Sequence, residues 1–143
     1  MKIFVAKLGF YTKTEDLIAL FSKFGKNSIK LYSKNEESQS NGVYQVTETL
    51  PAGDYTFSAY VSLLAAVKGG ENPGAYIRVV DGEGEILAES EHFSLGFKYV
   101  RLIAPFELAE TKSVQVQLLV DGKGIAYFDG AQLENNPFAN AYN

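Results

Sequence analysis

The sequence contains no cysteine and no tryptophan, and it has a single histidine, His92. The absence of cysteine excludes disulfide bonds, a thiolate nucleophile, and zinc or iron sites held by thiolates. One histidine excludes metal centres built from several histidines, and no serine or aspartate lies in a recognisable triad context. We therefore expect a protein that is not an enzyme, with His92 as a solvent-exposed residue at the end of a strand.

Basic residues are also in short supply. Thirteen lysines and arginines stand against seventeen aspartates and glutamates, which gives a formal net charge of -4. The lysines are scattered, so no positive stripe is available to follow a phosphate backbone, and we expect no nucleic-acid partner. The chain has no apolar run of the length that crosses a membrane, so no membrane partner is expected either.

The size and composition suit one domain. At 143 residues, with 46% hydrophobic and 13% aromatic residues, the chain can bury a core without help from a metal or a disulfide. We expect residues 1–143 to form a single domain. The start, "MKIFVAKLGF", lacks the long apolar segment and cleavage site of a signal peptide, so the chain is either cytoplasmic or a fragment of a larger precursor.

Beyond about residue 28 the chain is a succession of short strand-like runs separated by turn residues. Examples are "SIKLYS", "GVYQVTETL", "DYTFSAYVS", "AYIRVV", "KYVRLIAPF" and "SVQVQLLV", with Asp-Gly-x-Gly turns at 81–84 and 121–124. Strands at this spacing, joined by glycine turns, favour an all-β antiparallel sandwich. We predict eight or nine strands.

One segment near the N-terminus departs from this pattern. In "TKTEDLIALFSKFG" the apolar residues fall at helical spacing, after a capping-box pair and before a glycine stop; they are Leu17, Leu20, Phe21 and Phe24. The spacing predicts one short helix near residues 14 to 24, lying over one end of the sandwich.

The acidic residues of one hairpin invite a catalytic interpretation. Asp81, Glu83, Glu85, Glu89 and Glu91 lie close together in the sequence, as an acid and base pair would. A charged hairpin that protects a sheet edge from aggregation is the better account, because charge on an edge strand prevents pairing with other chains.

Alternation along the strands predicts which side chains point away from the core, since successive residues of a strand face opposite ways. The outward residues that suit a sugar are Tyr60, Tyr76, Arg78, Gln115 and Gln117. Aromatic rings stack on the apolar faces of pyranose rings, and planar polar groups hydrogen-bond their hydroxyls. Two interpretations stay open: a sugar-binding patch, and the ordinary surface of a sandwich.

Several segments resemble a known family. "GVYQVTETLPAGDYTFSAYVS", "FKYVRLIAPFEL", "SVQVQLLV" and "GIAYFDGAQLENN" occur in the order seen in the jelly-roll repeats, similar to carbohydrate-binding modules, of Gram-positive surface and secreted proteins. The resemblance covers roughly Gly25 to Asn143, and "ANAYN" (Ala139 to Asn143) looks like a junction to a following module. It implies a galactose-binding-domain-like jelly roll within a longer, secreted or cell-surface, multimodular protein, with glycans and neighbouring modules as partners.

The resemblance also implies a metal. In such jelly rolls the aspartate of the closing strand, here Asp129, contributes to a structural Ca²⁺, an ion that needs six to eight oxygen ligands. The alternative is an aspartate that caps a turn before Gly130.

For the whole chain, the resemblance implies a non-catalytic carbohydrate-binding module that tethers a larger extracellular protein to glycans. The alternative function is a structural or adhesion spacer of a surface, cell-wall or phage appendage protein, with no sugar site.

Overall fold

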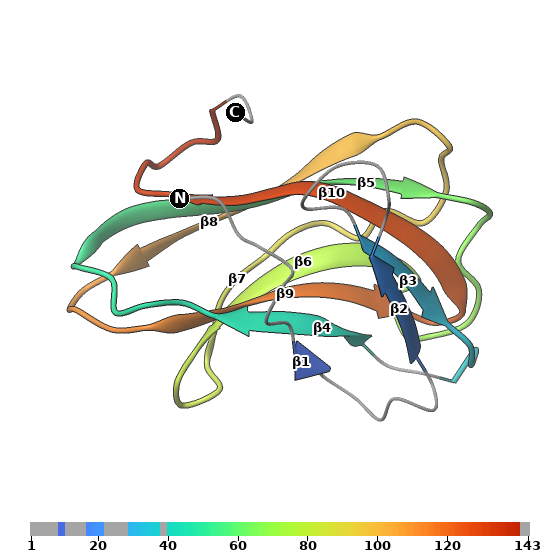
Figure 1. Cartoon of the computed structure of the whole chain (residues 1–143), viewed down its shortest axis with the longest axis horizontal. Coiled ribbons are helices and arrows are strands. Elements are labelled where there is room, and N and C mark those ends of the chain that lie inside the picture. Colours follow the sequence, from blue (N-terminus) through green and yellow to red (C-terminus); the bar gives the residue numbers. More distant parts are fainter. Residues whose placement is uncertain (1–8, 11–16, 22–28, 38–39, 141–143) are drawn as a thin grey trace.

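The chain folds into two antiparallel β-sheets that face each other, as Figure 1 shows. The computed structural model describes residues 9–10, 17–21, 29–37 and 40–140, and the first two of these ranges are described by their backbone. The first sheet contains, in spatial order, β1 (Gly9–Phe10), β4 (Asn41–Val46), β9 (Val114–Asp121), β6 (Gly74–Asp81) and β7 (Ile86–Glu89). The second sheet contains β2 (Leu17–Phe21), β3 (Ile29–Ser33), β10 (Gly124–Glu134), β5 (Gly53–Leu63) and β8 (Val100–Leu108).

This architecture confirms the all-β sandwich. Eight strands, β3 to β10, follow one another between Ile29 and Glu134, and every pair of neighbours in the two sheets is antiparallel. The described residues include no helix, and so none that is long and apolar enough to cross a membrane.

The predicted helix is wrong over Leu17–Phe21. These residues form β2, which pairs with β3 in regular register from Leu17 opposite Ser33 to Phe21 opposite Ile29. The remainder of the predicted helix, residues 14–16 and 22–24, lies outside the described residues. "LIALF" is a continuous apolar run, which periodicity alone cannot assign to a helix or a strand, and pairing with the edge of β3 decides it.

The core lies between the two sheets and is built from alternate residues of each strand. The predicted inward sets on β5, β6 and β9 are confirmed; their members Tyr55, Phe57, Ala59, Val61, Ala75, Ile77, Val79, Val114, Val116, Leu118 and Val120 all belong to one buried cluster. Phe128 of β10 and Leu31 of β3 complete it from the second sheet. Burial of this apolar area is the main favourable term in folding.

The acidic hairpin ends at the edge of the first sheet, where β7 is the last strand. Asp81 organises the turn, since its carboxylate accepts hydrogen bonds from the backbone N–H groups of Glu83 (2.9 Å) and Glu85 (3.0 Å). These hydrogen bonds, the one from Glu85 first, lower the pKa of Asp81, and the nearby Lys112 adds to the effect. The Asp81 carboxylate therefore has a structural explanation in the turn.

Candidate functional site

The five outward residues predicted to bind sugar do not form one patch. Tyr76 and Arg78 of β6 and Gln115 and Gln117 of β9 lie together on the outer face of the first sheet. Tyr60 lies on β5, in the second sheet, and so on the opposite side of the sandwich. Alternation assigns each residue to one face of its own strand but does not say which sheet the strand joins.

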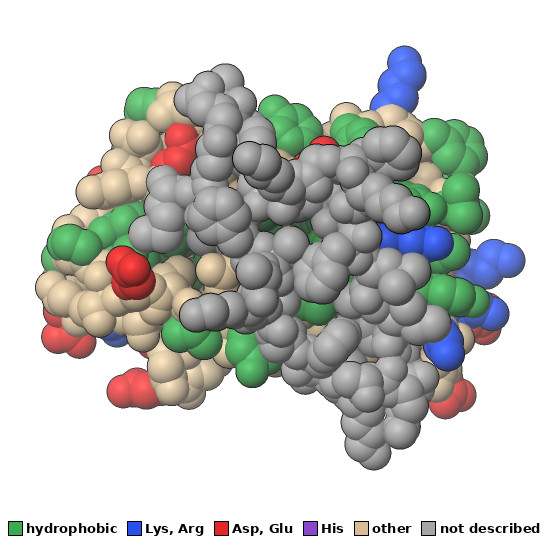
Figure 2. Space-filling model, in the orientation of Figure 1, with side chains coloured by type: hydrophobic (Ala, Val, Ile, Leu, Met, Phe, Trp, Pro, Cys, Tyr) green, Lys and Arg blue, Asp and Glu red, His purple; other side chains and the backbone are tan. Residues whose placement is uncertain are grey.

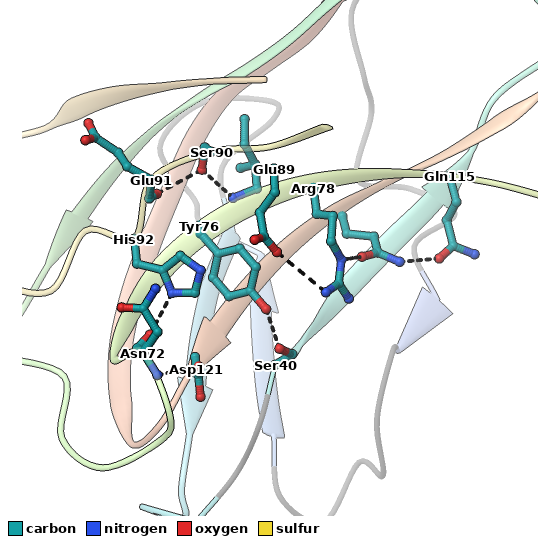
Figure 3. A network of polar contacts seen from close by, with 12 residues as sticks. Ser40, Asn72, Tyr76, Arg78, Glu89, Ser90, Glu91, His92, Gln115 and Asp121 are labelled. Atoms are coloured by element: carbon teal, nitrogen blue, oxygen red, sulfur yellow. Dashed lines mark hydrogen bonds and ion pairs between the residues drawn. The ribbon is translucent and has the colours of Figure 1, made fainter. Parts of the chain in front are cut away.

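A row of polar side chains crosses the outer face of the first sheet. By register, Gln117 lies between Tyr44 of β4 and Arg78 of β6, and Arg78 lies opposite Glu89 of β7. We call these four residues the polar row. The Nε–H of Arg78 donates to Oε1 of Gln117 (2.7 Å), and a guanidinium nitrogen of Arg78 lies 3.7 Å from a carboxylate oxygen of Glu89. The Nε2–H of Gln117 donates to Oε1 of Gln115 (2.6 Å), so the contacts run without a break across three strands (Figure 3).

Tyr76 lies beside the polar row and is held by contacts of its own. The ring of His92 stacks on it with 3.8 Å between ring centroids and 11° between the planes, and the Tyr76 hydroxyl is hydrogen-bonded to the Ser40 hydroxyl. Nδ1 of His92 lies 2.6 Å from the carbonyl oxygen of Asn72 (Figure 3). His92 is thus partly buried against a ring, which corrects the expectation of a solvent-exposed residue. Burial raises the pKa of Tyr76 above its ordinary value, and the Ser40 hydroxyl partly offsets this effect.

Burial divides the face into a floor and a rim. Gln117 is 0%, Tyr76 1% and Arg78 8% exposed, so these three side chains form a polar floor. Tyr44 and Gln115 are half-buried and Glu89 is exposed. The groups that a ligand can reach are therefore an aromatic ring, an amide and a carboxylate, held over the hydrogen-bonded side chains beneath.

Two residues of this face, Tyr44 and Glu89, were not among the sequence candidates. In "GVYQVTETL" the inward residue is Val43, which leaves Tyr44 outward by the alternation already used for β6 and β9. Glu89 was assigned to the protective hairpin, and the register places it opposite Arg78. Alternation finds Tyr44, whereas the pairing of Glu89 with Arg78 needs the strand order.

The outer face of the second sheet is different in character. Tyr60 has Asp129 and Arg101 on either side of it in neighbouring strands, and the guanidinium of Arg101 lies 5.2 Å from the centre of its ring. Tyr127 lies one row away on β10, with the ammonium group of Lys30 5.8 Å from its ring centre. This face carries aromatic rings with single cations over them and no row of linked polar groups in the described residues.

Asp129 lies at a β-bulge, where its carboxylate caps a turn. Its Oδ1 accepts the N–H of Gly130 (2.7 Å), the register of β10 against β5 shifts between Asp129 and Gln132, and Gly130 has a φ of 58° that favours glycine. Among the described residues no cluster of three or more acidic, histidine or cysteine side chains surrounds it, whereas calcium needs six to eight oxygens. The geometry matches the capped turn.

Solved structures with this arrangement of sheets have been described. The chain superposes on a family 4 carbohydrate-binding module (TM-score 0.65, 9% identity, 90% of this chain and 86% of that one). It also superposes on the C-terminal family 22 carbohydrate-binding module of Clostridium thermocellum Xyn10B (TM-score 0.62, 17% identity, covering 95% and 90%). The chain has the fold of carbohydrate-binding modules. A third such module, CBM36, was solved in complex with calcium and xylotriose (TM-score 0.56, 15% identity, covering 94% and 98%).

The same fold also occurs as part of a longer protein. The chain covers only 23% of an arabinose-bound GH51 α-L-arabinofuranosidase, with a TM-score of 0.60 and 13% identity over 90% of this chain. No protein-family model and no curated protein matches the sequence. The fold is therefore that of carbohydrate-binding modules, and the choice of ligand has to be argued from the side chains of this chain.

Proposed function

We propose that this chain is a non-catalytic carbohydrate-binding module whose ligand lies across the outer face of the first sheet. The observation that carries the proposal is the polar row, in which Tyr44, Gln117, Arg78 and Glu89 are aligned on four neighbouring strands. Three strand spacings separate its ends, about 14 Å, which suits an extended ligand rather than a single small molecule. Two members of the row, Gln117 and Arg78, are buried and hydrogen-bonded to each other, whereas an ordinary solvated sheet face carries exposed polar side chains.

The arrangement allows both kinds of contact that sugars need. The half-buried ring of Tyr44 offers a face for stacking, and Gln115 and Glu89 offer an amide and a carboxylate to hydroxyl groups. Gln117 holds the Gln115 amide through a contact of 2.6 Å, and Arg78 holds the Glu89 carboxylate through one of 3.7 Å. Side chains that are already fixed lose little freedom when the ligand binds, which improves the affinity of a shallow site.

The test is affinity gel electrophoresis of the full chain in gels containing xylan, β-1,4-galactan or β-glucan. We expect at least one polysaccharide to retard the protein, with a dissociation constant in the micromolar to millimolar range. Tyr44→Ala should weaken retention about fivefold, because stacking on one ring contributes on the order of 1 kcal/mol. Gln115→Ala should weaken it severalfold through the loss of a hydrogen bond.

The matched control is Ile103→Ala, which removes an exposed side chain from β8 of the second sheet. This variant should be retarded like the unmodified protein, and all three variants should keep their melting temperatures within a few degrees. If no polysaccharide retards the protein, the module is a structural or adhesion spacer. If Tyr44→Ala and Gln115→Ala are retarded as strongly as the control, the ligand does not lie on this face.

We also propose that the module acts outside the cell, as one part of a longer multimodular protein. One observation supports this proposal: the chain is similar to a part that amounts to 23% of a longer protein. Fractionation of the source cells with an antibody against the chain checks it. The protein should appear in the medium or on the cell surface, and recovery from the cytoplasm alone would contradict the proposal.

A further inference from the structure

A pocket lies at one end of the second sheet, away from the polar row. It is formed where the connection from β5 to β6 passes the turn between β9 and β10, and its volume is about 250 Å³. The residues that the argument uses from its lining are Tyr32, Glu36, Leu64, Lys68, Lys123 and Ile125. In Figure 2 lysine and arginine side chains gather at the right-hand end of the molecule, where Figure 1 shows this connection and this turn.

Backbone hydrogen bonds hold the walls of the pocket in place. Lys68 and Lys123 exchange two of them, at 2.9 and 2.7 Å, and the N–H of Gly70 donates to the carbonyl of Glu36 at 2.7 Å. Glycine makes this close approach possible: a Cβ on Gly122, whose φ is 99°, would lie 2.5 Å from the carbonyl oxygen of Lys68. The pocket is therefore preformed, and a ligand does not have to order a loop in order to bind.

The two lysines present an electrostatic problem that a ligand would solve. Residues that exchange both backbone hydrogen bonds across an antiparallel pair point their side chains to the same side, so the exposed side chains of Lys68 and Lys123 leave the backbone side by side. Like charges directly opposite one another destabilise a pair of strands. Within the described residues the ion pairs involve Arg78 and Lys112, and neither Lys68 nor Lys123 takes part in one.

The rest of the lining suits a ring. Tyr32 and Ile125 are cross-strand partners on β3 and β10, and with Leu64 they supply an aromatic and aliphatic wall. Pockets for drug-sized ligands begin at about 300 Å³, so the space available matches a single sugar residue. The wall can cover one face of a pyranose while the lysines meet a charged substituent.

The geometry points to a second binding site, in which this pocket takes an anionic sugar residue of the uronic acid type. Its carboxylate lies between the ammonium groups of Lys68 and Lys123, and its ring lies on Tyr32 and Ile125. The choice of a sugar rests on the proposed function of the chain. The choice of an anion rests on the pocket alone.

One acidic residue of the pocket lining, Glu36, should weaken the binding of an anion, and this effect can be tested. Glu36 lines the pocket, and it also borders a neighbouring hollow with Glu37 and Glu71. Its carboxylate repels an anion held by the two lysines. Removing that charge should therefore strengthen binding, which a loss-of-contact effect cannot do.

The experiment is a titration of the full chain with sodium glucuronate at constant ionic strength. Binding is measured from the chemical-shift changes of the backbone amides in ¹H–¹⁵N spectra. We expect millimolar binding with shifts confined to the amides around Lys68, Lys123 and Gly124. Glucose, the neutral counterpart, should bind about tenfold more weakly, since two ion pairs to exposed lysines are lost. Glu36→Gln should lower the dissociation constant for glucuronate about twofold.

The double variant Lys68→Gln with Lys123→Gln should bind glucuronate about tenfold more weakly and like glucose. Its matched control is Lys34→Gln with Lys98→Gln, which changes the net charge equally at two exposed positions outside the pocket lining and should bind as the unmodified protein does.

Three results would overturn the inference: no shift at these amides, equal shifts with glucose, or equal shifts with sodium acetate, which carries the charge without the ring. A failure here leaves the polysaccharide test of the first sheet untouched, because that test reads Tyr44 and Gln115.

Discussion

The outer faces of the two sheets are made by the same alternation of residues, yet they differ in chemistry. On the first sheet, Arg78 is hydrogen-bonded to Gln117 and paired with Glu89, and its side chain is nearly buried. On the second sheet, Arg101 lies over the ring of Tyr60 and donates one hydrogen bond to Ser58. The Nε–H of Arg101 has no hydrogen-bond partner in the described part of the chain.

Exposed apolar side chains are grouped beside the edge strand β8 of the second sheet, although Val46 of β4 and Ile86 of β7 are exposed on the first sheet. Of the eight large hydrophobic residues that are exposed in the described structure, four lie in the segment that leads into β8 and along that strand: Leu95, Phe97, Tyr99 and Ile103. Phe97 is 73% exposed. The first sheet therefore fixes its polar groups against one another, whereas the exposed rings Phe97 and Tyr99 lie in the segment that leads into the edge strand of the second sheet. A linked network is sensitive to the loss of any member, and isolated contacts are not.

The largest expected difference between the two faces is in the stability lost when an arginine is removed from each. Arg78→Ala leaves the Gln117 amide oxygen without its donor and Glu89 without its cation, so we expect the free energy of unfolding to fall by about 2 kcal/mol. Arg101→Ala, the matched change on the second sheet, should cost less than about 1 kcal/mol, because its contacts are half-exposed. Urea unfolding of both variants measures the difference. Equal losses would show that the polar row is no more coupled than the opposite face.

A smaller effect should appear at alkaline pH. Burial raises the pKa of Tyr76 above the ordinary value of 10.0, so the unfolded chain loses this proton before the folded one. The resulting stability is fully present below about pH 10 and is lost as the pH rises through the folded pKa. Tyr76→Phe should flatten the decline in the free energy of unfolding above about pH 10, measured by urea titration.

Tyr99 supplies the control for this pH dependence. Its pKa is also raised, chiefly by burial and then by the charges of Asp129 and Tyr127, but the residue is 52% exposed. Solvent screening reduces the contribution of a half-exposed group, so Tyr99→Phe should follow the unmodified protein. If the free energy of unfolding depended less on pH in Tyr99→Phe than in Tyr76→Phe, the exposed tyrosine would contribute more to the alkaline loss of stability than the buried one, which would contradict this prediction.

The smallest expected effect is that of calcium. The Asp129 carboxylate caps the bulge at Gly130 and has no acidic cluster around it in the described residues, so we expect no structural calcium there. The melting temperature should be the same, within about a degree, in excess chelator and in excess calcium chloride. A rise of several degrees with calcium would show a site on the second sheet and refute the turn assignment.

The strands from Ile29 onward were predictable because their hydrophobic residues alternate and their turns contain glycine. The strand Leu17–Phe21 was not, because a short run of five apolar residues carries no period. The candidate site was predictable in part. Four of the five proposed residues share a face, while Tyr60 points outward as predicted but belongs to the other sheet.

The sequence by itself determined the all-β class and the inward or outward direction of each residue along the strands of the core, because both follow from local chain geometry. Only the tertiary structure decided which strands became neighbours. Gln117 lies between Tyr44 and Arg78, and Lys68 lies opposite Lys123, through pairings between segments far apart in the chain. Such register depends on the burial of both inner faces at once, which no single strand specifies.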